Sequence, residues 1–306
     1  MSTPPKLARM IADILVDDGI TASIKLNMPR EEYDSIRRMN ASSLVAGIVD
    51  PHEEDASPVR DEFEATKIPP TRDEQDTYDK GTVTHLILLQ PEQLPGRVAV
   101  WDGGTRHGGE WDGFCEANKG KVLIRRRDLR DVQTACRAYR SHSRISSLLR
   151  ECDTEVGVFA KIEGIYSKGL IDAVTKTGPV TITDPKTSNI GVDSQSAWRA
   201  IRRFHYREKM GWYARLYREA TGKEVEQVRL LFLSLPPERL GLRSVKLVTA
   251  DLQWGEKRML TVLRAVKECM ETGKWPVFFA DEISEGPRDY ELDNDSNITF
   301  DGEAIE

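Results

Sequence analysis

The chain has 306 residues, of which 39% are hydrophobic and 31% are charged, and this composition is typical of a soluble globular protein. No run approaches the roughly eighteen apolar residues that a membrane span needs, and the N-terminal sequence lacks the apolar core of a signal peptide. We therefore expect a cytoplasmic protein with room for one large domain or two small ones. Four scattered cysteines without a C-x-x-C pair indicate free thiols, not a zinc, iron-sulfur or redox site.

The net charge of -6 is unevenly distributed along the chain. Residues 281–306 contain ten acids and one base, so the remainder is mildly basic, with a net charge of +3. Basic residues cluster at 119–130 and 199–209. Such clusters can neutralise phosphates, but charge alone favours ordinary solvated helix faces.

The N-terminal part of the chain combines helical and irregular patterns. Residues 1–75 mix short helical signals with Pro-rich and acid-rich sequence that is typical of loops. An amphipathic helix is predicted from about Thr77 until Pro91 stops it. Residues 98–120 are expected to be irregular, and the apolar spacing predicts one helix over 127–150.

The second half of the chain contains most of the strand signals. EVGVFAKIEG, YSKGLIDAV and PVTITDPK predict three strands of an antiparallel meander, with turns at 163–164 and 175–178. A helical region over 194–220 with Gly222 as its C-cap, the strands VRLLFLSL and VKLVTADL, and a helix over 255–273 follow. We predict an α/β fold with a mixed central sheet flanked by helices, forming a single domain over 1–280 and leaving a disordered acidic tail over 281–306.

Three charged residues interrupt the predicted meander: Asp172, Asp184 and Lys186. Strand alternation places Asp184 and Lys186 on one face, and a hairpin would bring Asp172 alongside them. Pro185 cannot donate a ladder hydrogen bond, so the sheet is expected to open there and free a backbone carbonyl. Two carboxylates and a carbonyl suit Mg²⁺ or Mn²⁺, although a surface hairpin with a salt bridge fits the same pattern.

A divalent cation at this position would favour chemistry on phosphate esters. It would act as a Lewis acid on a phosphoryl oxygen and lower the pKa of a bound water. Lys186 could orient or deprotonate that water, or stabilise charge developing on the phosphate. The pattern therefore predicts phosphodiester hydrolysis.

The order of Asp172 and then Asp184-Pro-Lys186 is that of the PD-(D/E)xK nuclease superfamily, and the chain resembles the RecE-like exonucleases (exodeoxyribonuclease VIII) of phages and prophages. The likeness covers most of residues 25–280 and seven motifs in the family's order. These are MPREEYDSIRRMNASSL, GTVTHLILLQPEQL, LLRECDTEVGVFA, KGLIDAV, DPKTS, FHYREKMGWY and ETGKWP.

The resemblance implies a role for each matching residue. Asp172 and Asp184 would bind metal, Lys186 would be the catalytic lysine, and the Pro185 carbonyl would be a further ligand. Glu155 would be an additional acidic residue of the site, and His85 would be a metal ligand or lie close to the metal. Three residues of the later helical region, Arg203, Lys209 and Tyr213, are expected to contact DNA.

The resemblance also implies an activity and partners. It implies a Mg²⁺-dependent enzyme, with Mn²⁺ as the other possible ion, that resects linear duplex DNA from 5′ ends and leaves 3′ single strands. It further implies a ring-like homo-oligomer and a RecT-type single-strand annealing partner. Lys209 stands where the family usually has Gln, and Leu170 where it often has Arg. Neither departure removes a metal ligand.

Two alternatives stay open, and a third lacks the cysteines that it needs. The first is an endonuclease on the same core, and the second is a non-catalytic DNA-binding recombination scaffold, which Lys209 and Leu170 make conceivable. The third, an iron-sulfur nuclease related to RecB, needs a cysteine cluster after the core, where Cys269 stands alone.

Overall fold

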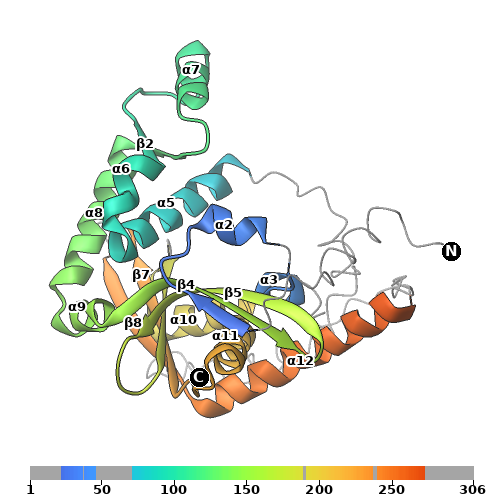
Figure 1. The fold of residues 1–306 in the computed structure, drawn as a ribbon. Coiled ribbons are helices and arrows are strands. Elements are labelled where there is room, and N and C mark those ends of the chain that lie inside the picture. The colour runs from blue at the N-terminus through green and yellow to red at the C-terminus, as the bar shows by residue number, and fades with distance from the viewer. Residues whose placement is uncertain (1–21, 37, 46–70, 189–190, 237–239, 273–306) are drawn as a thin grey trace, which may run out of the picture.

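The computed structural model describes residues 22–36, 38–45, 71–188, 191–236 and 240–272, and its centre is a six-stranded sheet (Figure 1). The strands are β1 (Ala22–Lys25), β4 (Cys152–Ile162), β5 (Ile165–Thr175), β6 (Thr181–Ser188), β7 (Gln227–Ser234) and β8 (Gly241–Leu247), adjacent in that order. All neighbours are antiparallel except β6 and β7, which are parallel. The predicted mixed α/β sheet is confirmed.

The antiparallel meander forms through the turns that the sequence indicates. Glu163 and Gly164, between β4 and β5, have φ values of 48° and 90°, as the twist of a tight hairpin requires. Gly178, with φ of 76°, lies in the turn between β5 and β6. These two strands form only the pairs Ala173↔Thr183 and Val174↔Ile182 before they separate.

A helical crossover joins the parallel strands β6 and β7, as parallel pairing requires. It contains α10 (Ser194–Arg203) and α11 (Tyr206–Thr221), so the single helical region expected there is interrupted. The break lies at His205, whose left-handed φ of 54° cannot continue a right-handed helix. Gly222, with φ of 71°, caps α11 as predicted.

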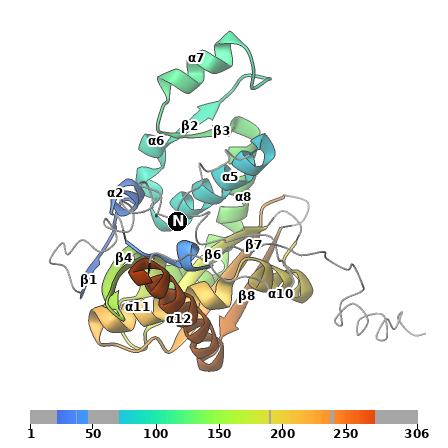
Figure 2. The same ribbon diagram turned by 90° about the vertical axis from the view of Figure 1, so that its right-hand side faces the viewer.

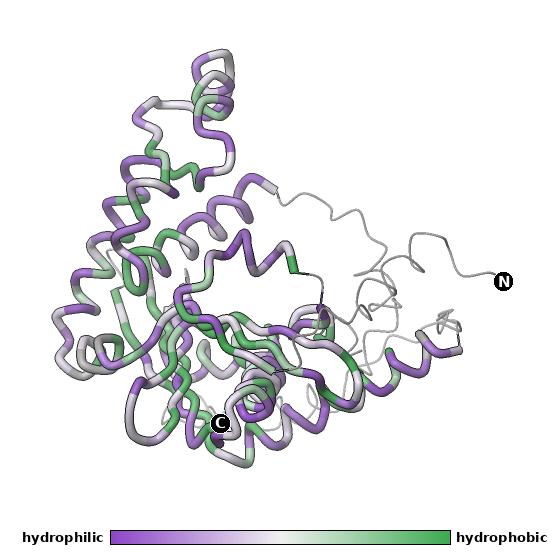
Figure 3. The backbone as a smooth tube through the Cα atoms, viewed as in Figure 1, coloured by the Kyte–Doolittle hydropathy of each residue, from purple (hydrophilic) through white to green (hydrophobic). Residues whose placement is uncertain are grey.

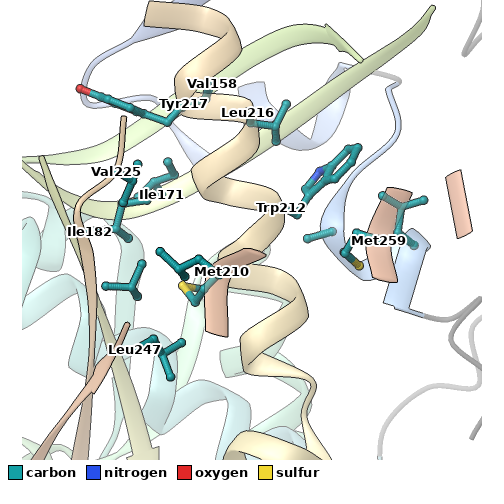
Figure 4. Close-up of a cluster of buried hydrophobic side chains, with 14 of the residues drawn as sticks. Val158, Ile171, Ile182, Met210, Trp212, Leu216, Tyr217, Val225, Leu247 and Met259 are labelled. Carbon is teal, nitrogen blue, oxygen red and sulfur yellow. The ribbon is translucent and has the colours of Figure 1, made fainter. Parts of the chain in front are cut away.

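Helices cover both faces of the sheet (Figures 1 and 2). On one face α3 (Ala41–Val45), α10, α11 and α12 (Thr249–Thr272) enclose the larger core, in which Trp212 and Leu216 of α11 are fully buried (Figure 4). On the other face α5 (Arg72–Leu89), α8 (Arg126–Ser141) and α9 (Ser143–Arg150) pack over β7. Figure 3 shows the hydrophobic residues concentrated on the central strands.

The helix α5 differs from its prediction at one end only. It begins at Arg72 rather than near Thr77, because Thr71 and Glu74 form a capping box that satisfies the first backbone amides. It ends at Leu89, before Pro91, as expected. The 3-10 turn Pro91–Gln93 and the short α6 (Leu94–Arg97) follow.

Other expectations were wrong. The segment 98–120, expected to be irregular, contains β2 (Val98–Trp101) and α7 (Gly109–Ala117), and β2 pairs in parallel with β3 (Val122–Arg125) as a second sheet. Together β2, α7 and β3 form a unit that lies at the top of Figure 1, above α5. The rings of Trp101, Trp111 and Phe114 pack together in it, with centroids 5.0–5.7 Å apart.

Two later elements end or divide earlier than expected. The single helix expected over 127–150 is divided at His142 into α8 and α9. The strand expected over VKLVTADL ends at Leu247, and α12 begins at Thr249.

The N-terminal region contains more structure than its loop-like composition indicates. Besides β1, residues within 1–75 form α2 (Arg30–Ser35) and α3. The acidic tail over 281–306 lies outside the described residues. Within the described ranges, no helix is long and apolar enough to cross a membrane, and Cys115, Cys136 and Cys152 are not joined in disulfides.

Two glycines allow α11 and α12 to cross closely. A Cβ atom placed on Gly211 would lie 2.4 Å from the backbone nitrogen of Glu256, and one on Gly255 would lie 2.2 Å from the carbonyl oxygen of Arg207. Both neighbours are backbone atoms, so a side chain at either glycine would force the helices apart.

We predict that Gly211→Ala destabilises the protein by about 1–3 kcal/mol, because overpacking at a helix crossing displaces backbone. Gly113→Ala is the matched control: it also lies in a helix, and no described heavy atom lies within 4 Å of its Cβ position. Urea unfolding should show lower stability for the first variant and equal or slightly greater stability for the second. Equal stability of Gly211→Ala and the wild type would contradict the close crossing.

Candidate active site

The point where β5 and β6 separate gathers the charged residues of the meander. Continuing the register beyond Ala173↔Thr183 places Asp172 opposite Asp184. Asp184 is 3% exposed, and its Oδ1 forms an ion pair with the Nζ of Lys186, two residues along β6. The structure therefore brings the three residues together where the ladder of hydrogen bonds ends.

The helix α5 adds His85 to this group. Its approach to β6 is close, because a Cβ atom on Gly81 would lie 3.5 Å from the Oγ1 of Thr187. One helical turn later, and therefore on the same face, the Nε2 of His85 lies 2.9 Å from the carbonyl oxygen of Pro185. The Nδ1 of the same ring lies 3.6 Å from the Oδ2 of Asp172. The Gly-x-x-x-His spacing thus positions an imidazole beside both strands.

Glu155 joins the group from β4 through an unusual backbone conformation. It lies opposite Asp172 between formed pairs of the β4–β5 ladder, and its φ is 48°. A positive φ is uncommon for a residue other than glycine and needs support from its surroundings. That support comes from the segment after β1, where the amides of Asn27 and Met28 donate to the carbonyls of Thr154 and Glu155, at 3.1 and 2.8 Å.

Side-chain ligand atoms of His85, Glu155 and Asp172 all lie within 4.8 Å of one another. Octahedral coordination with bonds of about 2.1 Å places ligand atoms about 3 to 4.2 Å apart, so a small closure would fit these three around one Mg²⁺ or Mn²⁺. The 2.9 Å between the Nε2 of His85 and the Pro185 carbonyl is a hydrogen-bond distance, so the Nδ1 of the ring is the atom that could bind the ion. This donor set is rich in oxygen and fits a hard divalent cation.

The electrostatics of the carboxyl groups also favour a cation. Burial raises the pKa of Asp184 to about 7; Lys186 lowers that pKa and Asp172 raises it. Burial raises the pKa of Asp172 and of Glu155 in the same way. Acids this close together and withdrawn from water resist ionisation, because desolvation disfavours the charged form and their charges repel one another. A divalent cation would allow all three to ionise.

His85 is neutral at physiological pH. Burial, reinforced by the positive charge of Lys186, lowers the pKa of His85 to about 4. If Nε2–H donates to the Pro185 carbonyl, the Nδ1 lone pair faces a carboxylate oxygen of Asp172, and two acceptors then lie 3.6 Å apart. A cation between them would satisfy both.

Lys186 keeps its proton. Burial alone would lower its pKa, but Asp184 and Asp172 outweigh burial and hold the pKa above its ordinary value. Of the roles that the sequence left open for Lys186, this charge state favours orienting water or stabilising a phosphate over deprotonating water.

The first turns of α11 border the group. The ring of Tyr206 lies 5.3 Å from the Nζ of Lys186 and 5.9 Å from the Nζ of Lys209. Burial, reinforced by Lys186, lowers the pKa of Lys209. Tyr213 has its pKa raised by burial and by the charges of Asp172 and Asp184. Two of the predicted DNA contacts, Lys209 and Tyr213, therefore border the acidic group.

Two residues singled out from the sequence lie elsewhere. Arg203 is exposed at the end of α10, with its guanidinium 5.6 Å from the centroid of the Phe204 ring. Leu170, which stands where RecE-like exonucleases often have Arg, is buried in a small cluster with Met28, Tyr33 and Phe159. Packed hydrophobic side chains therefore surround this position.

The sequence reasoning missed three residues near the group. The positive charges of Arg30, at the start of α2, and of Arg97 lower the pKa of Glu155 against the effect of burial. Tyr206 contacts both lysines. Arg30 and Tyr206 fall within motifs that resemble the family, but no spacing pattern in the sequence indicates which residues of those motifs face the acids.

Comparisons with known proteins place the fold. No protein-family model and no curated protein matches the chain. A solved structure described as "Putative exonuclease" from Eubacterium rectale covers 90% of this chain and 100% of its own, with 11% sequence identity and a TM-score of 0.55. The alkaline exonuclease LHK-Exo from Laribacter hongkongensis covers 44% of this chain and 69% of its own, with 11% identity and a TM-score of 0.25. The first likeness shows a shared fold; the second is too distant to carry an argument.

We predict that Mn²⁺ raises the melting temperature of the wild-type protein by about 5 °C near saturation, because the ion binds the folded state only. Asp172→Asn and His85→Ala should lose most of this shift. Asp102→Asn, an exposed carboxylate that pairs with Arg126, should keep it. Equal shifts for all four proteins in a thermal melt would show that Mn²⁺ binds elsewhere.

A second prediction concerns pH in the presence of a chelator. The raised pKa of Asp184 means that the folded state binds a proton that the unfolded chain releases above about pH 4, so this residue makes stability fall as pH rises toward 7. Asp184→Asn mimics the protonated form and removes the effect. The free energy of unfolding of Asp184→Asn, relative to that of the wild type, should therefore be higher at about pH 8 than at about pH 5 by about 1 kcal/mol or more. Urea unfolding at both pH values tests this, and a constant difference would contradict the raised pKa.

Proposed function

We propose that the protein is a Mg²⁺- or Mn²⁺-dependent exodeoxyribonuclease that hydrolyses linear duplex DNA from 5′ ends and leaves 3′ single strands. The observation that carries this proposal is the close group of three acids, of which Asp184 is buried, with Lys186 at the separation of β5 and β6. The fold shared with the Eubacterium rectale structure supports a nuclease. Strand direction and duplex preference come from the resemblance to RecE-like exonucleases.

The residues divide between holding a cation and handling the phosphate. Asp172, Asp184 and Glu155, with the Pro185 carbonyl and His85, would hold the ion. When bound, it would supply Lewis-acid assistance at a phosphoryl oxygen and an activated water. Lys186, kept protonated by its acidic neighbours, would stabilise the negative charge that grows on the phosphate as the bond to the leaving oxygen breaks.

Further cations would bind the DNA backbone beside the cluster. Lys209 lies on α11, with its Nζ 5.9 Å from the ring of Tyr206. Arg30 and Arg97 lie close enough to Glu155 to lower its pKa. Each offers a positive charge to a phosphate. Lys209, in place of the family's Gln, would contribute a charge rather than a paired donor and acceptor.

The biological setting follows from the resemblance alone. We propose a role in phage recombination, in which a ring-like homo-oligomer encloses DNA and passes the 3′ strand to a RecT-type annealing protein. The mildly basic character of residues 1–280 is compatible with DNA binding.

We predict that Lys186→Ala lowers nucleotide release with Mg²⁺ at least about a hundredfold, because the charge beside the phosphate is lost. Lys176→Ala is the control, since this residue is exposed in the turn between β5 and β6 and pairs with Asp153. Release of acid-soluble nucleotides from linear duplex measures both. Unchanged release by Lys186→Ala, with normal folding by circular dichroism, would defeat the assignment of the lysine.

The mode of cleavage is tested separately with two substrates. A duplex labelled at its 5′ ends should lose the label at once, whereas a 3′ label should be retained until late. A covalently closed circle should stay intact. Cleavage of the circle would favour the endonuclease, and no cleavage of either substrate with Mg²⁺ or Mn²⁺ would favour the non-catalytic scaffold.

A further inference from the structure

An exposed row of alternating tryptophans and arginines lies beside α11. The guanidinium of Arg207 lies 5.2 Å from the centroid of Trp198 on α10 and 5.7 Å from that of Trp254 on α12. Arg258, also on α12, lies 5.0 Å from the centroid of Trp254. Trp198 and Trp254 are 40% and 43% exposed. We call these four residues the tryptophan–arginine ladder.

The ladder is held in place by its surroundings. Gly255 contacts the backbone of Arg207, so the close crossing of α11 and α12 fixes the distance between the arginine and Trp254. The guanidinium of Arg207 pairs with Asp251 at 3.4 Å, and that of Arg258 pairs with Glu208 at 3.6 Å. These contacts orient the planar groups and leave the indole rings partly open to solvent. A ligand would meet a surface that is already ordered.

The surface around the ladder is positive. The helix α10 carries Arg199, Arg202 and Arg203, all exposed, and has no acidic residue over Ser194–Arg203. The negative charges of Asp251 and Glu208 pair with Arg207 and Arg258, not with the arginines of α10. An extended polyanion is therefore the partner that matches this surface in charge.

Aromatic rings connect this surface to the candidate active site. Phe204, 47% exposed, follows α10, and its ring centroid lies 5.8 Å from that of Tyr206. The ring of Tyr206 in turn lies 5.3 Å from the Nζ of Lys186. The exposed face and the acidic group therefore meet at the junction between α10 and α11.

We propose that the tryptophan–arginine ladder binds single-stranded DNA next to the active site, with bases stacked on the indoles and phosphates on the arginines of α10. Unpaired bases expose faces for such stacking, whereas the faces of paired bases are covered by their neighbours in the duplex. The proposal rests on the proposed function, because a resecting nuclease generates a single strand at its site. Tryptophan and arginine are also common at protein interfaces, but the acid-free surface of α10 favours the nucleic acid.

The test measures binding of a fluorescently labelled oligothymidylate to the full-length protein in a chelator, so that no hydrolysis occurs. Trp198→Ala and Trp254→Ala should each weaken binding about tenfold, and Trp254→Phe should retain most of it. Binding to the wild type should quench tryptophan fluorescence. Tyr78→Ala is the control, because Tyr78 is 60% exposed on α5, across the sheet, and its removal should leave binding unchanged.

Three results would separate the possible failures. If both tryptophan variants bind the oligonucleotide like the wild type, the ladder is not a DNA site. If they instead lower the oligomeric mass in sedimentation while DNA binding is unchanged, the ladder is an interface between copies of the chain. The wild type is also assayed with Mg²⁺ on linear duplex. Absence of cleavage there, with ladder-dependent binding intact, rejects the nuclease proposal and keeps the ladder as a single-strand site.

Discussion

The separation of β5 from β6 after two backbone pairs is the feature on which the site depends. If the ladder continued, Asp172 and Asp184 would face each other within a closed sheet. Instead, Pro185 lacks an amide proton, and its carbonyl turns toward His85 of α5. The opening places carboxyl groups beside one another, and Lys186 of β6 pairs with the buried Asp184 of the same strand. Charge repulsion among the acids makes the arrangement costly without a cation.

The rest of the fold places groups around this opening and offsets that cost. At Gly81 the helix α5 lies against Thr187 of β6, and the next turn of the helix presents His85. The segment after β1 holds Glu155 in its left-handed conformation. Behind the site, the core around Trp212 anchors α11 against the sheet, so Tyr206 and Lys209 are carried on a rigid helix. Strained and buried polar features are therefore concentrated at one place, as is common for functional sites.

Much of this architecture could be predicted from the sequence, because its signals are local. Turn glycines, strand alternation and the proline of β6 act within a few residues, and they indicated the meander and the meeting of Asp172, Asp184 and Lys186. The helix α5 begins earlier than its hydrophobic pattern indicates, because a capping box satisfies its first amides. The left-handed residue His205 interrupts a helical region that hydrophobic spacing alone predicts as continuous. The unit formed by β2, α7 and β3 could not be predicted, because four-residue strands and an aromatic cluster leave no periodic pattern. The positions of Arg30 and Tyr206 depend on tertiary packing. The catalytic and binding roles carried over from the family resemblance stay predictions.

We propose that Asp172, Asp184 and Glu155 bind one divalent ion together. The most direct measurement is the anomalous diffraction of a crystal of the protein grown with Mn²⁺. The account predicts a peak about 2.2 Å from oxygens of Asp172 and of Glu155 or Asp184, beside the Pro185 carbonyl and the His85 ring. A map from that crystal with no peak at this position would contradict it.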